Sequence, residues 1–367
     1  IGRPAVIAKR IEKFGLRLVE GTDYHVVNVE QDDRYRDFWQ TYHRMTERKG
    51  VTETLAKIDM RRRLSLIGTM LLQFASPVLL FLLLLHACVG YVELGTDSWI
   101  GNITGRILES KESGLWLFIW TSGLMFVLRF FAGPIVHKIN PLGLLFASAI
   151  FGTVGLLLLG NVSGVALCVI AATVYGIGKT FYWPTMLGVV SERFPKGGAL
   201  TMGAMGGIGM LSAGLLGGPV IGYKQDYFAS TKLQSVDKET YERFKVPTAG
   251  APLPGLPLIN GLDGSKVTVL EKGDNKGLQA DLATLEKAGA KGNIVEETKK
   301  LNTWWTDTEE KHAKEDAKKV ADARMYGGQM ALIYTAFVPA FMAIGYLLLI
   351  GYFASTGGYK QVHIGHD

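Results

Sequence analysis

The sequence predicts a mainly α-helical, polytopic membrane protein, because six long apolar stretches fill most of residues 77–353. A bilayer core about 30 Å thick takes about 20 apolar residues of helix to cross, and each stretch is near or above that length. Backbone groups in lipid must be satisfied within their own segment, which favours helices. The connections between the first five stretches are too short to give a soluble bundle a polar exterior. The predicted spans are 77–94, 114–136, 141–160, 164–190, 200–222 and 327–353.

Composition changes sharply along the chain, so it is interpreted by segment. A polar start (1–72) precedes spans one to five (77–223), and a soluble polar insert (224–326) separates them from the sixth span (327–353) and a tail (354–367). Small residues let helices approach closely, and we expect a tightly packed ridge on the fifth span. Its two rows at four-residue spacing are Gly209, Ala213 and Gly217, and Gly214, Gly218 and Gly222.

Charge and cysteine content exclude several functions. The net charge of +6 is modest and its basic residues are dispersed or lie at span ends, so we expect no nucleic-acid partner. Cys88 and Cys168 both fall inside predicted spans, which argues against a disulfide framework or a metal site. No signal peptide is visible, and the chain opens without an initiator Met, which favours a fragment.

The distribution of Lys and Arg predicts the orientation, because cytoplasmic loops carry an excess of both. Basic residues precede the first span (61–63), follow the second (137–138), lie between the fourth and fifth (193 and 196) and follow the sixth (360). These loops lie on one side. The N-terminal segment and the tail are therefore expected in the cytoplasm, and the insert 224–326 outside it.

The first seventy residues favour a small α/β fragment. We expect helices over 3–14 and 32–48, a β-branched strand over 24–29, and a further helix from Thr52 into the basic run 61–63. Four aromatic residues share one face of the second helix, where a core role is favoured over a cofactor site: Tyr35, Phe38, Trp39 and Tyr42. The basic run fits a solvated helix face, an anion anchor or an orienting signal beside the membrane.

Residues 1–71 or so resemble part of the phosphotransacetylase-like domain of bacterial NADP-dependent malic enzymes, on the evidence of 1–15 (IGRPAVIAKRIEKFG), 34–43 (RYRDFWQTYH) and 60–68 (MRRRLSLIG). That family decarboxylates malate oxidatively in a separate N-terminal module. No dinucleotide fingerprint following a strand is present here, and no carboxylate cluster for a metal. We therefore expect no catalytic residue, no cofactor and no enzyme activity. NADPH formed from malate and NADP would favour the alternative of a malic-enzyme fragment.

Four other segments resemble the C-terminal half of a transporter of the major facilitator superfamily (MFS). They are 86–99 (HACVGYVELGTDSW), 129–138 (RFFAGPIVHK), 175–184 (YGIGKTFYWP) and 192–198 (ERFPKGG). The resemblance implies a six-helix half-bundle in a bacterial inner membrane. It also implies secondary transport of a small polar solute, with or without a coupling ion, held between two six-helix halves. A second half or another copy would complete the cavity. A transporter half joined to a cytosolic enzyme fragment near 71–77 indicates a chimera, with a natural fusion as the alternative.

Ionisable groups within a span are costly and usually face a cavity, which identifies candidate substrate-binding residues. Lys179 lies near mid-span, with Tyr182 and Trp183 one turn on. Arg129 fits a cavity role or a side chain that reaches the headgroups. Two further candidates, Glu93 and Asp97, are four residues apart on one face if the first helix continues to residue 103, or solvated in a loop if it does not. His86 is expected to be a core histidine with its hydrogen bonds satisfied.

The insert contains a Pro/Gly-rich linker over 247–257 and helical patterns over 278–289 and 295–325. Trp304 and Trp305 fit either an anchor at the membrane surface or the insert's own core. No catalytic constellation is visible. A third class of function is therefore a membrane-anchored binding protein whose insert is the working part, and deletion of 224–326 would distinguish it from a transporter.

Overall fold

The computed structural model of the chain describes residues 4–23, 33–47, 50–62, 77–195, 198–289 and 292–362. The chain divides into two compact units, Ile1–Phe81 and Leu82–Asp367, and each is described by itself. The described residues are mainly helical and form no β-strand; their β pairing is confined to isolated bridges such as that between Lys245 and Leu262. The predicted mainly-α class is confirmed.

The first unit contains three short helices at the predicted places. They are α1 (Pro4–Lys13), α2 (Asp33–Thr46) and α3 (Glu53–Arg62). The Thr52 hydroxyl accepts a hydrogen bond from the Leu55 amide at 3.3 Å and so caps α3. The predicted strand 24–29 and all but the last residue of the predicted join at 71–77 lie outside the described residues.

The aromatic face of α2 forms the core of this unit, as predicted. Phe38 and Met60 are buried against each other, and the other three aromatic side chains of α2 pack around them. The Tyr35 hydroxyl donates to the Lys57 carbonyl at 2.8 Å. Arg61 lies over the Tyr35 ring at 5.7 Å, which favours a helix face for the basic run.

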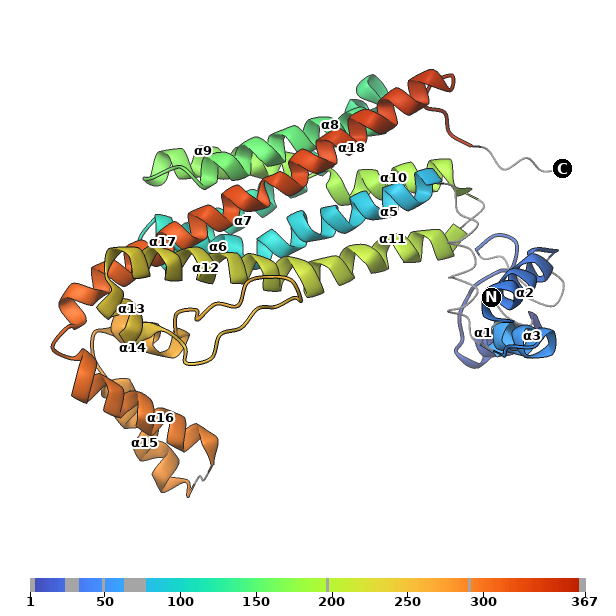
Figure 1. Cartoon of the computed structure of the whole chain (residues 1–367). Helices are drawn as coiled ribbons and strands as arrows, with labels where there is room; N and C mark the ends of the chain where they lie inside the picture. The colour runs from blue at the N-terminus through green and yellow to red at the C-terminus, as the bar shows by residue number, and fades with distance from the viewer. Residues whose placement is uncertain are drawn as a thin grey trace. The chain divides into compact units, whose positions relative to one another are not determined.

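The second unit is built from long helices that run beside one another (Figure 1). Its first helical stretch, which begins in the last residues of the first unit, is α5 (Pro77–Gly90), the π-helix η2 (Tyr91–Gly95) and α6 (Thr96–Ile107). The next helices are α7 (Lys111–Arg129), α8 (Ala132–Leu159), α9 (Val165–Lys179) and α10 (Tyr182–Arg193). The remaining long helices are α11 (Gly198–Ser212), the π-helix η4 (Ala213–Gly217), α12 (Gly218–Val236), α17 (Ala313–Thr335) and α18 (Phe337–Ser355).

Five helical stretches are long and apolar enough to cross a membrane, where six were predicted. They are Pro77–Ile107, Lys138–Leu159, Val165–Arg193, Thr201–Val236 and Ala313–Ser355. The second predicted span, 114–136, corresponds to α7 and the start of α8, and it is not among the five. Length and apolar composition therefore support a membrane protein but not the complete six-span count.

A kink inside α8 marks the start of the third predicted span. Asn140 has φ 55° and ψ 165°, and Pro141 follows it. The proline ring disfavours the helical conformation for the residue before it, and Asn tolerates positive φ better than most residues. The Asn140 carboxamide oxygen then accepts from the Gly143 amide at 2.9 Å, which caps the new helical segment.

Glycines bring the first span against the fifth at backbone distance. A Cβ on Gly90 would lie 2.0 Å from the Gly209 carbonyl oxygen, and one on Gly95 would lie 2.7 Å from the Cα of Gly217. The two π-helices η2 and η4 meet at this contact. The predicted ridge is confirmed for Gly209 and Gly217. In the second row, Gly222 lies against Trp99, whereas Gly214 faces open space.

The insert forms a small core of its own between α12 and α17. Its helices are α13 (Lys238–Phe244), α14 (Gly264–Lys272), α15 (Lys276–Lys287), α16 (Asn293–Trp304) and the π-helix η5 (Trp305–Glu309). Trp305 is 2% exposed and packs with Phe244 and Leu233. This favours a role for Trp304 and Trp305 in the insert's own core rather than as an anchor at the membrane surface. Helices α12 and α17 both extend beyond the predicted spans, to Val236 and from Ala313, and pack along each other.

Candidate functional site

The first span determines where the two acidic candidates point. Helices α5, η2 and α6 follow one another without a break, so the helix continues past residue 103. Glu93 lies in the π-helical segment and is 4% exposed, and Asp97 begins the next turn in α6. Both carboxylates therefore belong to a helix, and the alternative of a loop with solvated charges is wrong.

Asp97 pairs with the buried lysine of α9. The Lys179 ammonium lies 2.5 Å from an Asp97 carboxylate oxygen, and the lysine side chain is fully buried. It also lies over the rings of Tyr175 and Phe118, at 5.6 and 5.8 Å. A buried cation needs such a partner, because an isolated charge in a low-dielectric interior is strongly unfavourable.

Glu93 pairs with the arginine at the end of α7. An Arg129 Nη nitrogen lies 3.2 Å from a Glu93 carboxylate oxygen, and the Arg129 Nε donates to the Thr180 carbonyl at 3.1 Å. Arg129 is 41% exposed at its side chain, whereas Glu93 is nearly buried. The other Glu93 oxygen has no hydrogen-bond partner among the described residues. A buried oxygen without a donor costs free energy, so Glu93 is only partly satisfied by its ion pair.

The two aromatic candidates are held in different ways. Tyr182 is fully buried and donates to the Ser148 carbonyl at 3.1 Å. Trp183 packs edge-on against His86 with the ring centroids 4.6 Å apart. His86 is fully buried, but neither of its ring nitrogens has a hydrogen-bond partner among the described residues. The expectation of a satisfied histidine was therefore wrong.

The helices of the second unit thus place two ion pairs in an apolar bundle. The acidic member of each pair lies on the first span. Glu93 and Asp97 come from one helix, Arg129 from α7 and Lys179 from α9. Low polarity strengthens both pairs and makes an unpaired member costly. A movement of the first span that separated these pairs would therefore leave buried charges without their partners.

Tyr175 and Phe118 were missed by the sequence analysis. The Tyr175 hydroxyl donates to the Val92 carbonyl at 2.9 Å and so joins α9 to the π-helical turn that contains Glu93. Phe118 contributes its ring to Lys179 from α7. Tyr175 is one helical turn before Lys179, which is a usable signal, but Phe118 lies among apolar residues whose pattern does not single it out.

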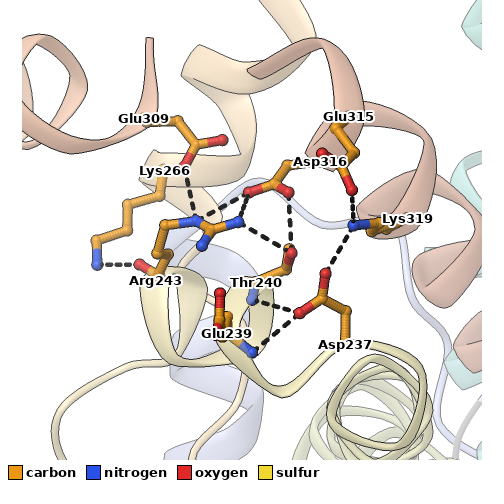
Figure 2. A network of polar contacts seen from close by, with 9 residues as sticks. All are labelled: Asp237, Glu239, Thr240, Arg243, Lys266, Glu309, Glu315, Asp316 and Lys319. Atoms are coloured by element: carbon orange, nitrogen blue, oxygen red, sulfur yellow. Dashed lines mark hydrogen bonds and ion pairs between the residues drawn. The ribbon is translucent and has the colours of Figure 1, made fainter. Parts of the chain in front are cut away.

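A second polar cluster holds the insert to α17 and is structural in character (Figure 2). Arg243 of α13 donates from both Nε and Nη2 to one carboxylate oxygen of Asp316, and the Thr240 hydroxyl donates to the other at 2.9 Å. Asp237 accepts from the Thr240 amide at 3.0 Å and from Lys319 at 2.6 Å. The hydrogen bond from Lys319, followed by that from the Thr240 amide, holds the pKa of Asp237 well below its usual range.

Glu309 is the least satisfied member of this cluster. It is fully buried and lies 3.5 Å from the Arg243 Nε, but neither carboxylate oxygen has a hydrogen-bond partner among the described residues. The pKa of Glu309 is raised to about 7; burial is the largest cause and the nearby Asp316 carboxylate adds to it, while Arg243 and then Lys266 act to lower it. Near pH 7 this carboxyl is divided between its neutral and charged forms.

We expect the insert to lose stability as pH rises from 5 to 7.5. The folded pKa of Glu309 lies above its ordinary value of 4.5, so the folded state binds the proton more tightly than the unfolded chain. The protonated Glu309 therefore adds to the free energy of unfolding fully below pH 4.5, and this contribution is lost as the pH rises through about 7. The expected loss is about 2 kcal/mol, measured from hydrogen-exchange protection of the α13 amides.

Glu309→Gln keeps the shape of the side chain but removes its proton equilibrium. This variant should show a flat protection profile between pH 5 and 7.5. Glu310→Gln is the matched control, because Glu310 is the exposed neighbour in sequence and its variant should keep the wild-type slope. An unchanged slope in Glu309→Gln would assign the pH effect to another group.

The second unit thus defines a helical protein whose apolar helices and buried ion pairs are compatible with a membrane. No family model matches the chain, and no solved structure matches it significantly. The similarity to known proteins lies in the first part of the chain, outside the ion-pair site.

That part is similar to bacterial malic enzymes. The chain is 38% identical over 73 residues to the NADP-dependent malic enzyme of Salmonella typhimurium and 40% identical over 72 residues to that of Haemophilus influenzae, each match covering 20% of this chain. It is 39% identical over 70 residues to the NAD-dependent malic enzyme of Rhizobium meliloti, over 19% of this chain. The chain spans about a tenth of the length of these relatives. The resemblance noted over about residues 1–71 is therefore confirmed for a malic-enzyme fragment.

Proposed function

We propose that residues 77–353 form a six-span half of a secondary transporter of the MFS type, which moves a small polar solute across the bacterial inner membrane. The observation that supports this most directly is the double ion pair inside an apolar bundle, Glu93 with Arg129 and Asp97 with Lys179. Charged groups at this depth are retained where they contact a solute, an ion or a proton. The six candidate residues named above supply that contact in the proposal.

In this proposal α7 is the sixth helix that crosses the membrane. Helix α7 exposes a broad apolar and aromatic surface: Leu115, Trp116, Ile119, Trp120, Phe126 and Val127. Such a continuous exposed apolar surface is unfavourable in water and fits lipid or a partner helix bundle. A second six-helix half, from another copy or another chain, would cover part of it and complete the cavity around the ion pairs. The partners of the chain are then the bilayer, this second half and the solute, with or without a coupling ion.

The orientation proposed from the basic residues can be tested by labelling. We expect a membrane-impermeant maleimide to label Asp281→Cys, in the insert, on intact spheroplasts. Lys360→Cys, in the tail, should be labelled only after the membrane is permeabilised. The native Cys168 is buried and Cys88 is partly buried, so the unsubstituted chain serves as the background control. Equal labelling of both variants on intact cells would contradict the orientation.

The second candidate is a fragment of a malic enzyme, favoured by the similarity of about 73 N-terminal residues to malic enzymes. The similarity covers about a tenth of those enzymes, so we propose that this segment is not itself catalytic. We propose that the chain is a chimera in which this segment has been joined to a transporter half. A contiguous sequencing read across residues 63–76 from genomic DNA would contradict that proposal.

A further inference from the structure

The Pro/Gly-rich segment of the insert is folded back on itself. Residues 246–262, here called the arm, leave the end of α13 and return to the start of α14. Two antiparallel bridges hold the outgoing and returning parts together, Lys245 with Leu262 and Gly250 with Ile259. The Gly250 and Ile259 amides each donate to the other residue's carbonyl, at 2.9 and 3.1 Å. The segment is therefore a paired loop and not an extended linker.

Two contacts place the arm along α12. A Cβ on Gly261 would lie 3.5 Å from the Cβ of Asp226, and the Tyr223 hydroxyl donates to the Pro257 carbonyl at 2.8 Å. Asp226 and Tyr223 are about one helical turn apart. The arm therefore runs from the insert toward the N-terminal end of α12, and Figure 1 shows its turn continuing in that direction, toward α11.

The arm meets α12 where the charge-free part of the fifth span ends. Residues 198–223 contain no charged side chain, and the first one after them is Lys224. A helix of that length extends about 39 Å, against about 30 Å for the hydrocarbon core of a bilayer. Tyr223 and the neighbouring pair of Gly222 with Trp99 then lie in the interfacial region, where Tyr and Trp are enriched.

The arm itself has the composition of a segment that leaves water. No charged residue occurs between Lys245 and Asp263. Prolines stand at positions 247, 252, 254 and 257, and a proline has no N–H group that would need an acceptor in lipid. Leu258, next to the carbonyl that Tyr223 holds, is 72% exposed. Burial of this side chain among acyl chains is favourable, whereas its exposure to water is not.

We propose that the arm binds the lipid bilayer, in the interfacial region of the leaflet on the insert's side, with Leu258 among the upper acyl chains. Tyr223 fixes the arm at that level, and the arm in turn keeps the insert close to the membrane surface. This inference rests on the proposed membrane placement of the bundle and adds a second, non-spanning contact with lipid.

A nitroxide attached to Leu258→Cys tests this placement in proteoliposomes of phosphatidylethanolamine and phosphatidylglycerol. Oxygen concentrates among acyl chains, whereas nickel ethylenediaminediacetate stays in water, so the ratio of their effects on nitroxide relaxation reports lipid. The ratio at Leu258→Cys should be several-fold higher than at Ile294→Cys. Ile294 is the matched control, because it is a similarly exposed apolar residue of the insert, 63% exposed, at the start of α16.

Leu347→Cys separates this inference from the membrane placement on which it rests. Leu347 is 54% exposed near the middle of α18 and should give a high ratio in any case where the bundle spans the bilayer. A high ratio at Leu347 with equal ratios at Leu258 and Ile294 would overturn the arm's placement alone. A low ratio at Leu347 would overturn the spanning bundle and the arm with it. A nitroxide at Leu258 that neither reagent reaches would indicate a protein partner and also overturn the proposal.

Photolabelling of the unmodified chain requires no variant to fold. A phosphatidylcholine with a diazirine in the upper part of one acyl chain is irradiated in the proteoliposomes, and the chain is then digested with trypsin. Cleavage after Lys245 and Lys266 releases the whole arm as peptide 246–266. This peptide should carry several-fold more lipid than peptide 277–287 of α15. Label in peptide 325–360, which contains α18, without label in 246–266 would contradict the proposal.

Discussion

Lys179→Met will destabilise the helical bundle by about 3–5 kcal/mol, since removing one member of a buried ion pair leaves the other charge uncompensated. Asp97 would lose the ammonium that lies 2.5 Å away, in a site where the lysine is fully buried. The measurement is unfolding in mixed micelles with increasing SDS. The double variant Lys179→Met with Asp97→Asn should recover most of the loss, because it removes both charges.

Lys224→Met is the matched control. Lys224 is partly buried, and its ammonium contacts a neutral group, the Tyr91 hydroxyl, at 3.1 Å. Its expected effect is much smaller than that of Lys179→Met. Under the proposed transport function, the matching change in a full-length transporter of the resembled family should also abolish uptake. Normal uptake there would remove Lys179 from the transport site and leave it a structural residue.

Gly90→Ala will have the second large effect, a loss of about 3 kcal/mol, because the first and fifth spans touch there by backbone. The added Cβ would lie 2.0 Å from the Gly209 carbonyl oxygen, and a backbone group cannot move aside as a side chain can. The helices must separate, which costs close contacts along their length. The same SDS titration measures this loss of stability.

Gly123→Ala is the control for Gly90→Ala. A Cβ at Gly123, also within a long helix, would meet no atom within 4 Å. Alanine in an open helical position is neutral or stabilises by about 0.5–1 kcal/mol. Equal losses in the two variants would mean that the close approach of the first and fifth spans does not form.

The long apolar helices and the first-unit helices were predictable because hydrophobic length and periodicity are local properties. Lys179 could be selected from its mid-span position alone, since a buried ammonium has few tolerable environments. Asp97 was also a candidate, but its pairing with Lys179 could not be predicted, because the sequence left open whether the first helix continues past residue 94. Three-dimensional contacts decide that, through the backbone approach of Gly95 to Gly217.

Other features depend on tertiary structure that no local pattern encodes. The two unsatisfied nitrogens of His86 result from its position against Trp183 and Gly209, which lie far away in the sequence. The extension of α12 to Val236 and of α17 back to Ala313 follows from their mutual packing, although both ends are polar. Polar composition led the sequence analysis to assign those ends to the insert.

The π-helical turn at Tyr91–Gly95 makes the charge pairing depend on how the first span is wound. A π-turn contains one residue more than an α-turn, and each residue of an α-helix rotates the chain by about 100°. Conversion of this turn to regular α-helix would swing Asp97 round the axis and away from Lys179. The π-helical turn Ala213–Gly217 packs against it across the interface, so rewinding either turn would also change the backbone contact between the first and fifth spans.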